Sequence, residues 1–141
     1  MNPLLELHEQ GQSYWLDNLS RPMLEQGELG RRVEEEGLRG VTSNPAIFSK
    51  AIRGSDAYDE QIREQVRADR PVSVIYEAVA TTDIRAACDV LRPVYDEAGG
   101  RDGFVSLEVS PHLARDTEGS VAEARRLYAA VDRPNVLIKL P

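Results

Sequence analysis

The sequence predicts a single α/β domain built around a parallel β-sheet. Two observations support this. Four short strand-like segments alternate with helical segments along the 141 residues, and one side-chain face of the strand-like segments is almost entirely apolar. Strands and helices in strict alternation form right-handed β–α–β units, whose strands run parallel. No internal repeat, low-complexity segment or flexible linker divides the sequence.

The four expected strands are short apolar runs bounded by residues that favour turns. They span residues 12–19, 38–43, 103–109 and the run that follows Pro134-Asn135. The second strand ends at Asn44-Pro45, and the third follows the pair Gly99-Gly100. Glycine, proline and asparagine interrupt regular structure, so they are typical of strand boundaries.

The expected helices are recognised by apolar residues at helical spacing. An amphipathic helix should follow Pro22 and end at Gly37, and further helices should cover 45–51, 56–68 and 72–97. Within the last of these, Thr82-Asp83 is interpreted as an internal cap, and Pro93 as a residue that ends or kinks the helix. Ser120 and Glu123 match a capping box for a final helix over 121–131.

Composition narrows the class of protein. The chain is 41% apolar and 29% charged, which is typical of a soluble globular domain. A net charge of −7 disfavours nucleic acid and acidic membrane surfaces as partners. The single cysteine, Cys88, suits a reducing compartment. With no signal-peptide pattern and no run of about 20 apolar residues, we expect a cytoplasmic protein. His8 and His112 lack metal-ligand spacing, so no metal is expected.

Residues two apart on a strand share one face of the sheet, which divides the strand residues into two sets. One set is apolar and should be covered by helices; it contains Tyr14, Leu16, Val41, Val105, Leu107, Val109, Val136, Ile138 and Leu140. The other set is polar and contains Asp17, Thr42, Asn44, Ser106, Glu108, Ser110 and Lys139. Parallel α/β folds place their sites at the carboxyl ends of the strands, so this polar set is the candidate site.

Lys139 is distinctive because the chain contains only two lysines against fifteen arginines. A desolvated lysine can lose its proton and attack a carbonyl to form a Schiff base, whereas arginine stays charged. Burial among Leu137, Ile138 and the neighbouring strands would favour the free amine. The simpler alternative is a strand-end lysine that reaches into solvent.

Two carboxylates accompany this lysine. Glu108 is flanked by Leu107 and Val109, and a carboxylate in such a strand is usually paired or functional. Asp17 can equally be a cap that ends its strand before the turn at residues 20–22. Together with Lys139 they would provide a nucleophile and separate acid and base groups for imine chemistry.

A polar tip follows the second strand. Thr42, Ser43 and Asn44 could contact a ligand there. They are equally compatible with an ordinary strand-to-helix turn, in which Pro45 holds Asn44 extended and occupies the first helical position.

Four segments resemble transaldolases. Residues 40–48 (GVTSNPAIF) resemble the first signature of the family, and residues 136–141 (VLIKLP) resemble the start of the second, which carries a Schiff-base lysine. Residues 11–21 (GQSYWLDNLSR) and 104–120 (FVSLEVSPHLARDTEGS) are similar to the longer bacterial subgroup. Because four matches occur in order across nearly the whole chain, the resemblance is specific.

The resemblance implies a parallel (β/α)8 TIM barrel, of which residues 1–141 would form the N-terminal half with the first four β/α units. It also implies an activity without a cofactor. A dihydroxyacetone unit would pass from a ketose phosphate of the sedoheptulose 7-phosphate type to an aldose phosphate of the glyceraldehyde 3-phosphate type, in the pentose phosphate pathway.

The same resemblance assigns roles to single residues. Lys139 would form the imine with the donor carbonyl, Asp17 would be the acid/base group during carbon–carbon cleavage, and Glu108 would act through a water. Asn44 would bind the dihydroxyacetone portion, with Thr42 and Ser43 as further substrate-binding residues.

The length of the chain departs from the family pattern. The phosphate-binding residues of the family lie on later strands, so we expect a chain truncated after strand four, with negligible turnover. Its open sheet edges would favour a homo-oligomer.

Two other functions remain open at this point. A related class I aldolase would use the same imine but release free dihydroxyacetone or a similar ketone. A non-catalytic sugar-phosphate-binding module would form no covalent adduct with a donor.

Overall fold

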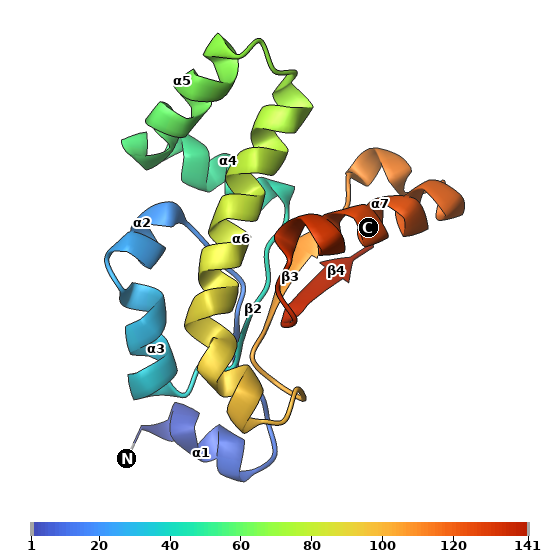
Figure 1. The fold of residues 1–141 in the computed structure, drawn as a ribbon. Helices are drawn as coiled ribbons and strands as arrows, with labels where there is room; N and C mark the ends of the chain where they lie inside the picture. The colour runs from blue at the N-terminus through green and yellow to red at the C-terminus, as the bar shows by residue number, and fades with distance from the viewer. Residues whose placement is uncertain (1, 141) are drawn as a thin grey trace.

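The computed structural model describes residues 2–140 and contains the expected alternation of strands and helices (Figure 1). The strands are β1 (Trp15–Leu16), β2 (Gly40–Val41), β3 (Phe104–Glu108) and β4 (Val136–Lys139). They form one sheet in the order β1-β2-β3-β4, with every neighbouring pair parallel. The predicted α/β class is therefore confirmed, and the sheet has the order expected of the first four units of a (β/α) barrel.

Seven α-helices lie among the described residues. They are α1 (Pro3–Glu9), α2 (Arg21–Glu25), α3 (Glu28–Glu36), α4 (Pro45–Arg53), α5 (Asp59–Arg67), α6 (Val72–Glu97) and α7 (Thr117–Val131). Two short 3₁₀ turns, η1 (Asp56–Tyr58) and η2 (Pro111–Leu113), complete the set. Figure 1 shows α6 as the long central helix; it packs on β3, and α7 packs on β4.

The apolar face of the sheet forms the core. Val41, Val105 and Val109 are fully buried, and they pack in one cluster with Ile84 and Leu91 of α6. Burying each such side chain stabilises the fold by about 1.5–3 kcal/mol. This matches the face predicted from side-chain alternation.

Leu140 is an exception to the predicted covered face, because it is 56% exposed. The last strand ends at Lys139, so Leu140 lies past the paired part of the sheet.

The first two strands are shorter than predicted, but their hydrogen bonding extends beyond the assigned residues. The N–H of Arg39 donates to the carbonyl of Tyr14 (2.8 Å), and the N–H of Thr42 donates to the carbonyl of Leu16 (2.9 Å). Between them Gly40 meets Trp15 closely: a Cβ on Gly40 would lie 2.3 Å from the indole ring. Only glycine therefore allows the two strands to approach here.

Two predictions about helices were wrong, one at Gly27 and one inside α6. The helix expected between Pro22 and Gly37 is divided into α2 and α3 at Gly27, whose φ of 70° breaks the helical backbone. The cap expected at Thr82-Asp83 is wrong, because α6 runs unbroken from residue 72 to 97. Thr82 Oγ1 donates to the Ala78 carbonyl of its own helix (2.8 Å), while Asp83 is buried.

The start of α7 also differs from the prediction. Asp116 is the N-cap residue, and its carboxylate accepts a hydrogen bond from the N–H of Gly119 (2.9 Å). Ser120 therefore lies inside the helix, where its hydroxyl donates to the carbonyl of Leu113 (3.0 Å). The capping box expected at Ser120 and Glu123 is not formed, because the helix begins at Thr117 instead.

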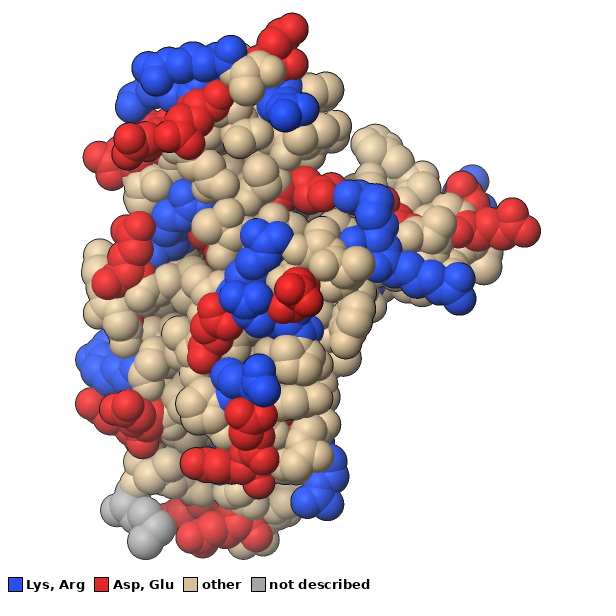
Figure 2. All heavy atoms as spheres, in the orientation of Figure 1, with Lys and Arg blue, Asp and Glu red and all other residues tan. Residues whose placement is uncertain are grey.

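Charged side chains of both signs are interspersed over the helical face (Figure 2). Several form ion pairs one helical turn apart, such as Arg92 with Asp96 in α6 (2.9 Å). Such exposed pairs contribute little to stability. Among residues 2–140, no helix has the length and apolarity needed to cross a membrane.

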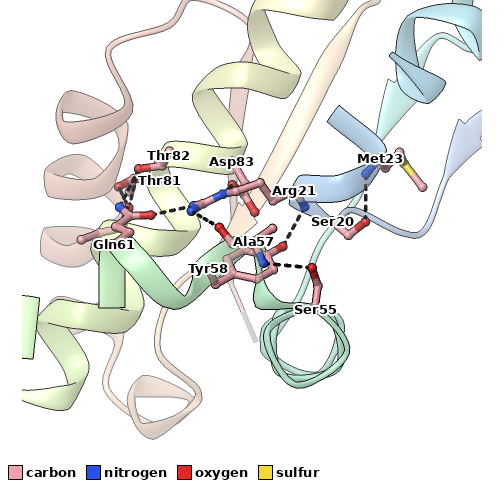
Figure 3. A network of polar contacts seen from close by, with 11 residues as sticks. Ser20, Arg21, Met23, Ser55, Ala57, Tyr58, Gln61, Thr81, Thr82 and Asp83 are labelled. Carbon is pink, nitrogen blue, oxygen red and sulfur yellow. Dashed lines mark hydrogen bonds and ion pairs between the residues drawn. The ribbon is translucent and has the colours of Figure 1, made fainter. Parts of the chain in front are cut away.

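A buried polar network joins α2 to α5 and α6 (Figure 3). The guanidinium of Arg21 donates to Asp83 (2.9 Å) and to Gln61 (2.7 Å), and it lies 4.5 Å from the centre of the Tyr58 ring. The backbone N–H of Arg21 also donates to the Tyr58 hydroxyl (2.7 Å). The chain just after β1 is thus fixed to helices that lie far away in the sequence.

Burial determines how much the ion pair between Arg21 and Asp83 contributes to stability. The side chains of Arg21 and Asp83 are only 11% and 1% exposed. Burial raises the pKa of the Asp83 carboxyl, and the attraction of Arg21 only partly opposes that rise. Burial likewise raises the pKa of Tyr58 to about 12. The pair is therefore costly to bury, and removing one partner would leave an uncompensated charge inside the protein.

We expect Asp83→Ala to lower the free energy of unfolding by about 3–5 kcal/mol, because Arg21 would remain buried without its counter-charge. Urea unfolding followed by circular dichroism measures this. Asp96→Ala removes an exposed partner of an arginine and is the matched control, with an expected change below about 1 kcal/mol. Equal losses in the two variants would contradict the assignment.

Candidate active site

The candidate site begins with a contact between β3 and β4. Their register places Glu108 beside Lys139, and paired residues of a parallel sheet project from the same face. The Lys139 Nζ atom lies 3.2 Å from Glu108 Oε2. Two residues predicted from the sequence as site residues are thus in direct contact.

Thr42 extends this cluster to β2. Its Oγ1 atom accepts a hydrogen bond from Lys139 Nζ (3.3 Å) and another from the Ser106 hydroxyl (3.0 Å). The amine therefore has a carboxylate partner on one neighbouring strand and a hydroxyl partner on the next. These contacts fix the direction of the lysine side chain across the polar face of the sheet.

The amine is less buried than the sequence suggested. The side chain of Lys139 is 37% exposed and that of Glu108 is 18% exposed. Leu137, which shares their face, is 42% exposed. An ion pair this open to solvent adds less than about 1 kcal/mol of stability. Its main effect is to position the amine.

Asp17 lies at the same rim, one residue past β1. Because Leu16 is paired with Val41, Asp17 lies level with Thr42. Its side chain is exposed, and within residues 2–140 it makes no hydrogen bond or ion pair. The cap of α2 is instead Ser20, whose hydroxyl oxygen accepts from the N–H of Met23 (3.3 Å). The carboxylate of Asp17 is thus available to a ligand.

Asn44 combines a structural contact with a free donor group. It is the N-cap of α4, and its Oδ1 atom accepts from the N–H of Ile47 (2.9 Å). Its backbone is extended, as expected before Pro45. The amide NH₂ group has no partner among the described residues. The turn interpretation is therefore confirmed, and substrate binding by Asn44 stays a prediction.

Ser43 is directed away from this cluster. It is fully buried, and its hydroxyl donates to the backbone carbonyl of Ser106 (2.7 Å). This bond holds β2 to β3, so the geometry offers no accessible Ser43 hydroxyl to a substrate. Its predicted substrate contact finds no support in the geometry.

Ser106 and Tyr76 also belong to the surroundings of the site, and of these two only Ser106 was placed on the polar face from the sequence. Alternation along β3 already placed Ser106 on the face of Glu108. Tyr76 gave no such signal, because it comes from α6. Burial, and then the negative charge of Glu108, raise the pKa of Tyr76, and its ring packs edge-on against Phe48 (6.1 Å).

Tyr76 lines a largely apolar cavity of about 350 Å³, bounded by Pro45, Leu107 and the first residues of α6. No cluster of three or more potential metal ligands occurs within residues 2–140.

Comparison with known families agrees with this geometry. The protein-family model described as Transaldolase/Fructose-6-phosphate aldolase matches residues 14–141 of this chain. That range includes all four strands and the whole polar cluster. The chain belongs to this family. The family resemblance inferred from four segments of the sequence is thereby confirmed.

Individual relatives of this transaldolase-family chain are similar over nearly its whole length. It is 51% identical to "Transaldolase 2" of Nostoc punctiforme over 140 residues, which are 99% of this chain and 37% of that protein. It is 49% identical to "Transaldolase" of Thiobacillus denitrificans (100% and 39%) and 49% identical to "Transaldolase" of Thermobifida fusca (99% and 38%). The chain therefore spans less than two-fifths of the length of these relatives.

We expect Thr42→Val to lower the free energy of unfolding of this chain by about 1–3 kcal/mol, because it leaves the buried Ser106 hydroxyl without its acceptor. Urea unfolding measures the loss. Adding Ser106→Ala removes the unsatisfied donor, so the double variant should recover most of the lost stability. A double variant less stable than Thr42→Val would show that the two hydroxyls do not depend on each other.

Proposed function

We propose that this chain forms the first four β/α units of a transaldolase and supplies its Schiff-base lysine, Lys139. The observation that carries the proposal is the contact of Lys139 Nζ with Glu108 Oε2 (3.2 Å) and Thr42 Oγ1 (3.3 Å) at the carboxyl ends of three strands. A primary amine beside a carboxylate supplies a nucleophile and a group that can take and return a proton, both of which imine formation can use. The names of the relatives support the same reaction.

The first chemical step would be attack of the Lys139 amine on the ketone of the donor. Glu108, through a bridging water, would first take one proton from the Lys139 ammonium group. As the carbon–nitrogen bond forms, a second amine proton would pass to the ketone oxygen, which becomes the hydroxyl of the carbinolamine. The carbinolamine would then lose its hydroxyl as water, with the proton returned from the Glu108 side. The product is a protonated imine and one molecule of water. Thr42 would hold the amine in line with the carbonyl.

The second step would break the carbon–carbon bond next to the imine. Asp17 would take the proton of the hydroxyl group at the carbon that becomes the aldehyde. The bonding electrons would pass into the protonated imine, which becomes an enamine, and the aldose phosphate would leave. The free amide of Asn44 would donate to the dihydroxyacetone portion. Attack of the enamine on a new aldose phosphate would reverse these steps.

We also propose the substrates, the pathway and the compartment of the reaction. The donor would be a ketose phosphate of the sedoheptulose 7-phosphate type and the acceptor an aldose phosphate of the glyceraldehyde 3-phosphate type. The pathway would be the pentose phosphate pathway in the cytoplasm, and no cofactor is needed, because the imine itself accepts the electrons. The buried thiol of Cys88 suits a reducing compartment.

A second reaction is favoured by one observation, the description of the matching family, which includes fructose-6-phosphate aldolase. Such an enzyme would use the same imine but hydrolyse it to release free dihydroxyacetone. The two reactions differ in the fate of the three-carbon unit. A protein that only binds sugar phosphates would form no covalent intermediate.

We expect borohydride treatment in the presence of fructose 6-phosphate to attach the donor covalently to Lys139, because hydride reduces the imine to a stable secondary amine. Peptide mass mapping locates the adduct. Lys139→Arg should abolish it, and Lys50→Arg, which changes the only other lysine, should leave it in place. A chain that binds the donor without an adduct would refute the imine mechanism.

Residues 1–141 alone should turn over substrate at a negligible rate, because the polar face of the sheet is open and Lys139 is partly exposed to water. A coupled assay with a ketose phosphate and glyceraldehyde 3-phosphate measures the rate. Ordinary transaldolase rates from this chain would show that the four strands suffice for catalysis.

A further inference from the structure

A second, more polar cavity lies between the loop after β1 and the end of α4. Its volume is about 210 Å³. Its polar lining residues are Asn18, Ser20, Lys50 and Ser55. None of the residues of the Lys139 cluster lines it.

The two serines present unused hydroxyl protons to this cavity. The Ser20 oxygen accepts from the N–H of Met23 (3.3 Å), and the Ser55 oxygen accepts from the N–H of Ala57 (3.1 Å). Neither hydroxyl donates a hydrogen bond within residues 2–140. Because each oxygen already serves as an acceptor, each O–H group remains to donate. Both serines line the cavity, and Figure 3 shows them at the starts of two different segments, Ser20 before α2 and Ser55 before η1.

The charge in the cavity is positive. The Lys50 ammonium group has no ion-pair partner among the described residues, and no carboxylate lines the cavity. The amide of Asn18 is exposed and makes no hydrogen bond in the described part of the chain. The carbonyls of Lys50 and Ala51 at the end of α4 both accept from the N–H of Gly54 (3.0 and 3.2 Å). The groups left without partners are therefore mostly donors.

The walls of the cavity are fixed relative to each other. Arg21, which directly follows Ser20, donates through its backbone N–H to the hydroxyl of Tyr58 (2.7 Å) and through its guanidinium to the carbonyl of Ala57 (3.4 Å). Both acceptors lie within three residues of Ser55. A ligand would thus meet donors that are already in place, which reduces the entropy lost on binding.

We propose that this cavity binds a phosphate oxyanion, with Lys50 supplying the charge and Ser20, Ser55 and Asn18 donating hydrogen bonds. Oxyanions are the ligands that combine a negative charge with several acceptor atoms. The site would lie beside Asp17, because Asn18 is the next residue. It is separate from the phosphate-binding residues that the family resemblance assigns to later strands. It also goes beyond the proposed function, since it needs no imine.

The test is a titration of the ¹⁵N-labelled chain with inorganic phosphate at constant ionic strength. Amide resonances of Asn18, Ser20 and Ser55 should shift together and give one dissociation constant. Lys50→Gln should raise that constant about tenfold or more, and Asn18→Ala should raise it by a smaller factor. Both residues are exposed, so circular dichroism should show that the variants fold as the parent does.

Arg67→Gln is the matched control, because it removes one exposed positive charge from α5 without touching the cavity; its dissociation constant should equal that of the parent. A titration with glycerol 3-phosphate distinguishes the source of the oxyanion: tighter binding than inorganic phosphate identifies a phosphate ester, and weaker binding identifies the free ion. The proposal is overturned if Lys50→Gln changes the constant less than twofold, or if Arg67→Gln weakens binding equally. Because no carbonyl substrate is present, neither outcome depends on Lys139 chemistry.

Discussion

Parallel pairing of β3 with β4 is the constraint on which the candidate site depends. The register that sets Glu108 beside Lys139 also sets Val105 beside Val136 on the opposite face. Side chains alternate along a strand, so a shift of one residue would turn Lys139 toward the helices and Val136 toward solvent. Burial of the valines against α6 and α7 therefore determines where the amine points. The N–H of Val109 donates to the carbonyl of Lys139 (3.0 Å) and continues the ladder past the site.

Residues at the carboxyl ends of the strands combine structural contacts with chemical availability. Thr42 accepts two hydrogen bonds that order the cluster, and Asn44 uses its oxygen for the α4 cap while its amide group stays free. The loop after β1 is held by the buried pair of Arg21 and Asp83 rather than by the sheet. Helix packing on one face and this network at the rim together leave an ordered polar surface on the other face.

Much of the fold and the centre of the site follow from local sequence patterns. Alternation of strand residues predicts both the apolar face and the proximity of Lys139 to Glu108. Local patterns give wrong or no predictions where the position of a side chain depends on residues far away in the sequence. The local sequence around Asp83 indicates a helix cap, but in the structure Asp83 accepts a hydrogen bond from Arg21, 62 residues away. Asp116 and Ser120 are both good caps, and Ser120 is instead directed to the carbonyl of Leu113. Tyr76 is near the site only because α6 packs beside β3, which no local pattern indicates.

The close approach of Trp15 to Gly40 has a practical consequence for optical work on this chain. Trp15 is the only tryptophan, its ring lies against the backbone of β2, and its indole N–H donates to Ser13 (2.9 Å). Intrinsic fluorescence excited at the tryptophan band therefore comes from a single chromophore at the junction of β1 and β2, two residues before Asp17. The emission spectrum therefore reports the environment of Trp15 at one edge of the sheet, and not an average over several sites in the molecule.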